Sequence, residues 1–106
     1  MRTPYRFTPS ALDDLDEILT HISADSQSAA RRVESAIFDA CIMLARNPFL
    51  GSKRSEITSL PVRFWVLTRF PNYIVVYRPE IAPLQIVAVL HAKRDIKRVL
   101  MERRTQ

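Results

Sequence analysis

The chain has 106 residues, of which 47% are hydrophobic and 25% are charged. It is therefore long enough for one hydrophobic core and too short for two separate domains. It lacks a run of the ~18 apolar residues needed to cross a bilayer, and its N-terminus lacks the apolar core of a signal peptide. The single cysteine, Cys41, has no intramolecular disulfide partner. These features predict one domain, residues 1–106, in the cytoplasm.

Charge is distributed unevenly along the chain. Residues 1–50 contain 5 Lys or Arg and 7 Asp or Glu, whereas residues 51–106 contain 11 and 4. The net charges of the two parts are therefore −2 and +7, which together give the formal +5. A strongly basic second half indicates a polyanionic or acidic partner. The alternative is a solvated basic surface with no partner.

Residues 4–8 ("PYRFT") predict a short strand, because they alternate weakly and include Tyr and Phe. Thr8 is placed to cap a following helix, with Pro9 at the first position, where a missing N–H costs nothing. Apolar residues then recur at helical spacing: Leu12, Leu15, Ile18, Leu19 and Ile22. Four carboxylates are expected largely on the solvent side, near the helix start where the dipole favours them: Asp13, Asp14, Asp16 and Glu17.

A second helix follows the break at residues 23–28 ("SADSQS"). Its apolar stripe consists of Ala30, Val33, Ile37, Ala40, Cys41 and Leu44. The helix should end at Asn47, because a residue before proline is disfavoured in helical conformation. Residues 47–61 then predict an irregular connector that contains the only glycine, Gly51, with Lys53 and Arg54 at its tip.

Three strands are predicted in the second half, at residues 62–70, 72–78 and 84–92. In the first of them, alternation places Val62, Phe64, Val66 and Thr68 on one face and Arg63, Trp65, Leu67 and Arg69 on the other. The near-continuous apolarity of residues 84–90 predicts an interior strand, and the short connections favour antiparallel neighbours.

A terminal helix is predicted over residues 95–104, packed through Ile96, Val99 and Leu100. The four cations around it are then free to face solvent: Lys93, Arg94, Lys97 and Arg98. The predicted fold class is α+β. An N-terminal strand and a helical hairpin pack on a mainly antiparallel sheet (β-α-α-β-β-β), and a C-terminal helix follows.

Conventional catalytic motifs are missing from the sequence. One glycine excludes a glycine-rich phosphate loop, and Cys41, His21 and His91 are too scattered for a metal site, so neither a metal nor a cofactor is expected. The candidate site is a group of cations, an imidazole and an indole near strand ends: Arg63, Trp65, Arg69, Arg78, His91, Lys93 and Arg94. Such a patch suits RNA or an acidic protein surface. The alternative is that Trp65 is a core residue and the arginines only cover a sheet edge.

Four segments resemble, in order and spacing, the ParE branch of the RelE/ParE toxin superfamily, the toxin halves of bacterial type II toxin–antitoxin modules that include plasmid stabilisation systems. They are "YRFTPSALDDLDEI", "NPFLG", "VRFWVLTRFPNYIVVYRP" and "IVAVLHAKRDIKRVL". The resemblance runs from about Tyr5 to Leu100 and implies a helical hairpin on an antiparallel sheet. It also implies a cognate ParD-like antitoxin, bound in a hetero-oligomer.

The superfamily divides over function, so the resemblance leaves alternatives. ParE relatives are associated with poisoning DNA gyrase, which implies a non-enzymatic inhibitor whose target-binding residues would be Lys93, Arg94, Lys97, Arg98, Arg63, Trp65 and Arg69. RelE relatives cleave messenger RNA on the ribosome, and the matching set here would be His91, Arg63, Arg69 and Arg78. No tyrosine follows Tyr77, where many RNA-cleaving relatives have one, and this favours the ParE branch. A third alternative is an inactive member that only binds an antitoxin.

Overall fold

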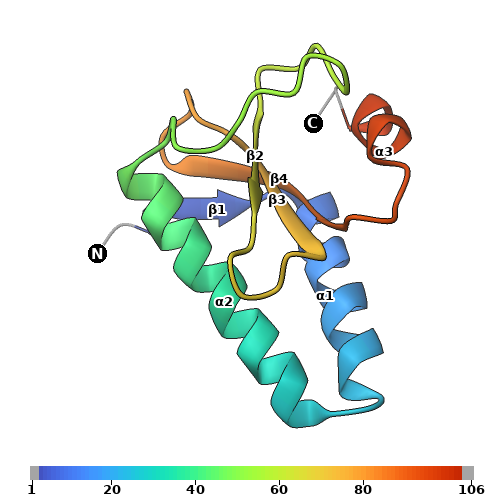
Figure 1. Cartoon of the computed structure of the whole chain (residues 1–106). Helices are drawn as coiled ribbons and strands as arrows, with labels where there is room; N and C mark the ends of the chain where they lie inside the picture. The colour runs from blue at the N-terminus through green and yellow to red at the C-terminus, as the bar shows by residue number, and fades with distance from the viewer. Residues whose placement is uncertain (1–2, 104–106) are drawn as a thin grey trace.

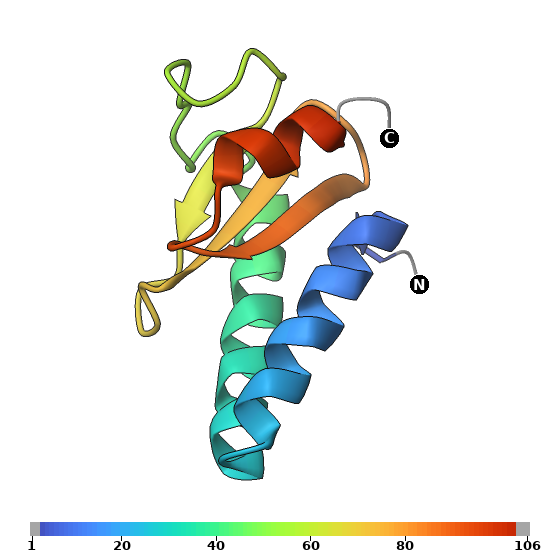
Figure 2. The ribbon, with the colours of Figure 1, turned by 90° about the vertical axis from the view of Figure 1, so that its right-hand side faces the viewer.

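The structure, a computed structural model, describes residues 3–103. It contains a four-stranded sheet, with a helical hairpin on one face and a short helix on the other (Figures 1 and 2). In chain order the elements are β1 (Tyr5–Phe7), α1 (Pro9–Ser23), α2 (Gln27–Arg46), β2 (Arg63–Val66), β3 (Tyr73–Arg78), β4 (Leu84–His91) and α3 (Ile96–Glu102). The α+β class and the element order confirm the sequence prediction.

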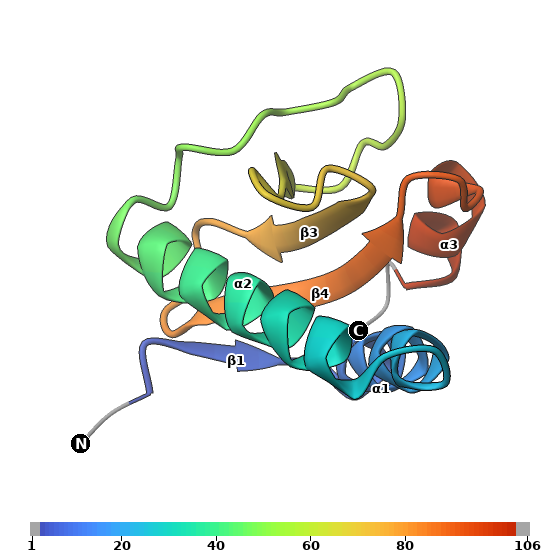
Figure 3. The ribbon, with the colours of Figure 1, turned by 60° about the horizontal axis from the view of Figure 1, so that its bottom comes forward.

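The sheet has the strand order β1-β4-β3-β2. β1 runs parallel to β4, whereas β3 is antiparallel to both β4 and β2, so the sheet is mainly antiparallel as expected. β4 lies between two other strands (Figure 3), and all of its residues except Gln85 and His91 are buried. The prediction of an interior strand is thereby confirmed.

Both hairpin helices begin at side-chain caps. The Thr8 hydroxyl accepts a hydrogen bond from the Ala11 N–H at 3.1 Å, and the Ser26 hydroxyl accepts one from the Ala29 N–H at 3.0 Å. Each cap satisfies one of the backbone donors that a helix leaves free at its N-terminus. The predicted cap at Thr8 and the predicted end of α2 at Asn47 are both confirmed.

The two faces of the sheet carry separate hydrophobic cores. The larger core lies between the sheet and the hairpin and includes Leu15, Ile37, Leu44, Val75, Tyr77, Ile86 and Val89. The smaller core lies between the sheet and α3 and includes Val62, Phe64, Val76, Ala88, Leu90, Val99 and Leu100. The predicted alternation in β2 is therefore correct for Phe64, which faces α3, and for Trp65, which packs against the hairpin-side core.

The sequence predicted two elements of the second half to be longer than they are. The strand expected over residues 62–70 is β2, only Arg63–Val66, because residues 67–72 form the turn to β3, closed by Leu67 N–H bonding the Tyr73 carbonyl at 3.0 Å. Thr68 and Arg69 therefore lie in that turn and on neither strand face. The terminal helix expected over residues 95–104 is α3, only Ile96–Glu102, with Asp95 and Arg103 as its caps; the expected last residue, Arg104, lies outside the described residues.

The apolar stripe of α1 is also phased differently from the prediction. Leu12 is 52% exposed, whereas Ala11 is fully buried and Asp14 is only 4% exposed. Ala11, Asp14 and Leu15 share one face because they are three or four residues apart. Asp14 was expected on the solvent side with its neighbours, and this prediction is wrong.

The connector at residues 47–61 is tied to the sheet around Gly51. The Gly51 N–H donates to the Tyr77 hydroxyl at 2.9 Å, and Ser52 forms an isolated bridge with Phe64. A Cβ atom on residue 51 would lie 2.6 Å from the Tyr77 hydroxyl oxygen and 2.8 Å from the Phe64 carbonyl oxygen. The only glycine is therefore required by close approach of the chain.

Gly51→Ala is expected to destabilise the protein by about 1–3 kcal/mol, because a buried hydroxyl and a backbone carbonyl would have to move. Urea denaturation would measure this loss. Ser52→Ala is the matched control, since the exposed neighbouring residue already has a Cβ, and it should change stability by less than about 0.5 kcal/mol. Equal midpoints for Gly51→Ala and the wild-type protein would contradict this account of the glycine.

Candidate functional site

A basic surface extends from the end of β4 into α3. The Asp95 carboxylate caps α3 by accepting the Arg98 N–H at 3.2 Å, and Val99 and Leu100 are buried against the sheet. This orientation leaves the remaining faces of the turn and helix in solvent. We use the term basic rim for the four exposed cations there: Lys93, Arg94, Lys97 and Arg98. Their predicted exposure is confirmed.

The basic rim is only weakly neutralised by its surroundings. Among the described residues, its one ion pair joins Arg98 to Glu102 at 3.8 Å, and both side chains are largely exposed. Such exposed pairs contribute little to stability. With four cations against the two carboxylates of Asp95 and Glu102, residues 93–102 keep a net positive charge, which suits attraction of an anionic surface.

His91 ends β4 beside the basic rim. Its ring contacts Tyr73 edge to face, with the ring centroids 5.3 Å apart, and its Nδ1 accepts the Lys93 N–H at 3.0 Å. The imidazole is half-buried and holds the start of the β4–α3 turn. The Arg94 N–H also donates to the His91 carbonyl at 3.0 Å, so His91 fixes the backbone of the turn at Lys93 and Arg94.

The residues that the RNA-cleaving alternative would use do not meet at one place. Tyr73 pairs with His91 at one end of the β3–β4 ladder, whereas Arg78 pairs with Gln85 at the other, about 16 Å away for five residues of strand. Arg63 lies opposite Tyr77 and therefore near the Arg78 end. Arg69, in the β2–β3 turn, is at the His91 end.

Arg63 is bound to the connector. Its Nη1 donates to the Gly51 carbonyl at 2.7 Å and to the Phe49 carbonyl at 3.3 Å, and its guanidinium carbon lies 5.2 Å from the centre of the Phe49 ring. These contacts hold the connector against β2. The geometry gives Arg63 an anchoring role.

Trp65 and Arg69 line a groove between α2 and the β2–β3 hairpin. The groove has a volume of about 510 Å³. Trp65 is half-buried in it, and α2 supplies the opposite wall with, among others, Arg31, Arg32, Asp39 and Met43. The groove combines an aromatic floor with a mostly cationic border.

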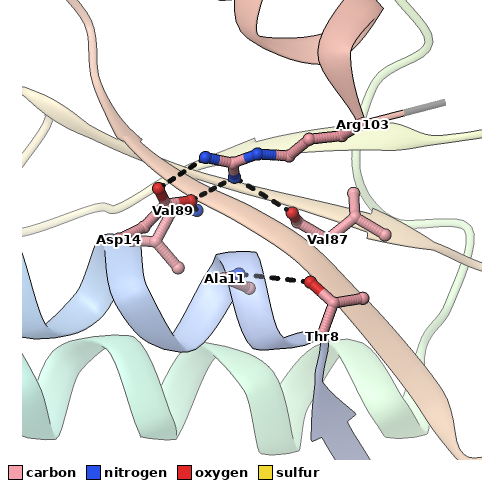
Figure 4. Close-up of polar contacts among 6 residues, drawn as sticks. All are labelled: Thr8, Ala11, Asp14, Val87, Val89 and Arg103. Carbon is pink, nitrogen blue, oxygen red and sulfur yellow. Dashed lines mark hydrogen bonds and ion pairs between the residues drawn. The ribbon is translucent and has the colours of Figure 1, made fainter. Parts of the chain in front are cut away.

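A buried ion pair that the sequence did not reveal connects α1 with the end of α3 (Figure 4). The Asp14 carboxylate accepts hydrogen bonds from Arg103 Nη1, from Arg103 Nη2 at 2.7 Å and from the Val89 N–H at 3.0 Å. Arg103 Nη1 also donates to the Val87 carbonyl at 3.2 Å. The hydrogen bond to Asp14 raises the pKa of Arg103 despite its burial. We call this pair the Asp14–Arg103 clamp.

The part of the chain that the structure describes gives little support for metal binding or for a reactive cysteine. Residues 3–103 hold no group of three or more His, Cys, Asp or Glu side chains able to bind a metal ion. Cys41 is fully buried, and burial raises the pKa of its thiol to about 12, so the thiolate is scarce at neutral pH. No helix between residues 3 and 103 is long and apolar enough to cross a membrane.

The fold is that of a small α+β domain, in which a helical hairpin and a C-terminal helix cover the two faces of a mixed sheet. A solved structure described as the chromosomal ParDE TA system from P. aeruginosa is similar to this chain, with a TM-score of 0.65 and 22% identity over 82% of this chain and 92% of the other. No curated protein matches the sequence. The family model for the ParE toxin of the type II toxin–antitoxin system parDE matches residues 5–96. The chain therefore belongs to the ParE toxin family, and the resemblance seen in the sequence is confirmed.

Proposed function

We propose that this ParE-family toxin inhibits DNA gyrase in the cytoplasm, without catalysis, through its basic rim. The observation that supports this most is the rim itself: four exposed cations on a capped turn and helix, with one weak ion pair among them in residues 3–103. A field of this kind raises the rate of encounter with an anionic target. The RNA-cleaving alternative has less support, because Arg63 and Arg78, two of the three arginines in its expected set, are remote from His91. A general acid or base must lie within reach of the cations that stabilise the transition state.

The toxin is neutralised, in this proposal, by a cognate ParD-like antitoxin that binds the groove between α2 and the β2–β3 hairpin. Trp65 offers a large apolar surface there, and Arg31, Arg32 and Arg69 outnumber Asp39 on the border. An amphipathic acidic segment would match both properties. Such a segment would pay an entropic cost on ordering, which the buried apolar area must offset.

Induced expression of the chain alone is expected to stop bacterial growth, and co-expression of the acidic product of the adjacent reading frame should restore it. The two proteins should then co-purify. A toxin that is harmless alone and indifferent to that product would contradict the proposal.

Arg69→Glu should weaken antitoxin binding by about tenfold or more, because it places a like charge opposite an acidic segment. Arg69 is an exposed turn residue, so the fold should tolerate the change. Lys53→Glu is the matched control, with the same charge reversal on the exposed connector. Titration calorimetry with the purified antitoxin measures both, and equal losses for the two variants would argue against the groove as the binding site.

A further inference from the structure

Helix α3 is attached to the protein at two points. It has seven residues, and its apolar contact with the sheet rests mainly on two buried side chains, Val99 and Leu100. The second attachment is the Asp14–Arg103 clamp at its C-terminal end (Figure 4). The family model ends at Ile96, so nearly all of α3 and Arg103 lie beyond the residues that define the family match.

Because of the clamp, the position of α3 on the sheet depends on the buried charge of Asp14. Asp14 is 4% exposed, and within residues 3–103 Arg103 is the only cation paired with it. If α3 lifts from the sheet, Arg103 leaves and a buried carboxylate loses its counter-charge, which is strongly unfavourable. The bidentate geometry also allows only a narrow range of positions for the guanidinium. Both effects favour a single position of α3.

The basic rim is divided between two segments. Lys93 and Arg94 lie in the turn that His91 holds, whereas Lys97 and Arg98 lie on α3. The distances between the two halves of the rim therefore depend on where α3 is seated. Asp14, near the start of the chain, lies 89 positions from Arg103, so the clamp connects the hairpin directly with this surface.

We propose that Asp14 and Arg103 are positioning residues, which fix Lys97 and Arg98 relative to Lys93 and Arg94 and so assemble the basic rim as one target-binding surface. The effect on toxicity rests on the proposed function. The effect on α3 does not, and it is measured separately.

Hydrogen exchange of the purified toxin tests the structural part. In Arg103→Gln, the backbone amides of α3 should lose protection by about tenfold or more relative to the wild-type protein, while those of β3 and β4 change much less. Asp14→Asn combined with Arg103→Gln should recover part of this protection, because the unpaired buried charge is then absent. Glu102→Gln is the control, since it removes only the exposed pair with Arg98, and α3 should keep its protection. Unchanged α3 protection in Arg103→Gln would overturn the proposal.

Growth inhibition tests the functional part with the same variants. Arg103→Gln should need at least about tenfold more protein to stop growth, Arg103→Lys should be intermediate because it keeps the charge and loses the bidentate geometry, and Glu102→Gln should match the wild-type protein. Loss of α3 protection with full toxicity would refute the positioning role and leave the proposed function standing. A wild-type protein without toxicity would instead refute the proposed function, while the exchange data would still decide whether the clamp seats α3.

Discussion

Changing Lys93, Arg94, Lys97 and Arg98 together to Gln is expected to abolish growth inhibition and to leave the thermal midpoint within a few degrees of wild type. The side chains are exposed, and the one ion pair that they form within residues 3–103, Arg98 to Glu102, is a surface pair of a kind worth ~0–1 kcal/mol. Their long-range attraction, by contrast, can change association rates by about 10- to 1,000-fold. Growth curves after induction, with thermal unfolding of the purified variant, measure both effects.

The control for this variant removes the same charge from other places. Four exposed cations away from the basic rim serve for this purpose: Arg6, Arg46, Lys53 and Arg54. If their replacement by Gln also abolishes toxicity, total charge matters and the position of the rim does not. If the rim variant stays fully toxic, the functional surface lies elsewhere, with the groove around Trp65 as the next candidate.

Leu100→Asp should be the most destabilising single change considered for this protein. Leu100 is fully buried between α3 and the sheet, so the change removes an apolar contact and introduces a carboxylate without a partner. We expect a loss of about 4 kcal/mol or more, which for a domain of this size lowers the midpoint by roughly 15–30 °C. Thermal unfolding followed by circular dichroism measures it.

Met101→Asp is the matched control for that change. The neighbouring side chain is 64% exposed on the same helix, so the same carboxylate should alter stability by less than about 0.5 kcal/mol. Similar midpoints for Leu100→Asp and Met101→Asp would mean that the helix is not packed as described.

The order of elements could be predicted from the sequence because each has a strong local signal. Thr8 and Pro9 mark a helix start, and the apolar run of residues 84–90 marks an interior strand. The buried face of α1 was harder to predict, since Leu12 and Leu15 suggested an apolar stripe that excludes Asp14. Phasing the stripe on Ala11 would have placed Asp14 on the buried face. Its partner carries no such signal, because Arg103 lies 89 positions away and looks like one more basic residue near the end of the chain.

The candidate site was predictable only where exposure follows from the local pattern. Val99 and Leu100 define the packed face of α3, which leaves Lys97 and Arg98 in solvent. The prediction that Arg63 and His91 lie close together depended instead on the length of β2 and on its register with β3. The turn at residues 67–72 shortens β2, and the antiparallel pairing places Arg63 near the far end of β3. Neither property follows from the alternation of side chains alone.

A supercoiling assay with purified DNA gyrase tests the central claim most directly. The wild-type toxin should inhibit supercoiling and cause cleaved DNA to accumulate, the variant with four Gln in the basic rim should not, and excess antitoxin should restore gyrase activity. Fully active gyrase, together with ribosome-dependent mRNA cuts that disappear in His91→Ala, would contradict the claim and assign the toxin to the RNA-cleaving branch.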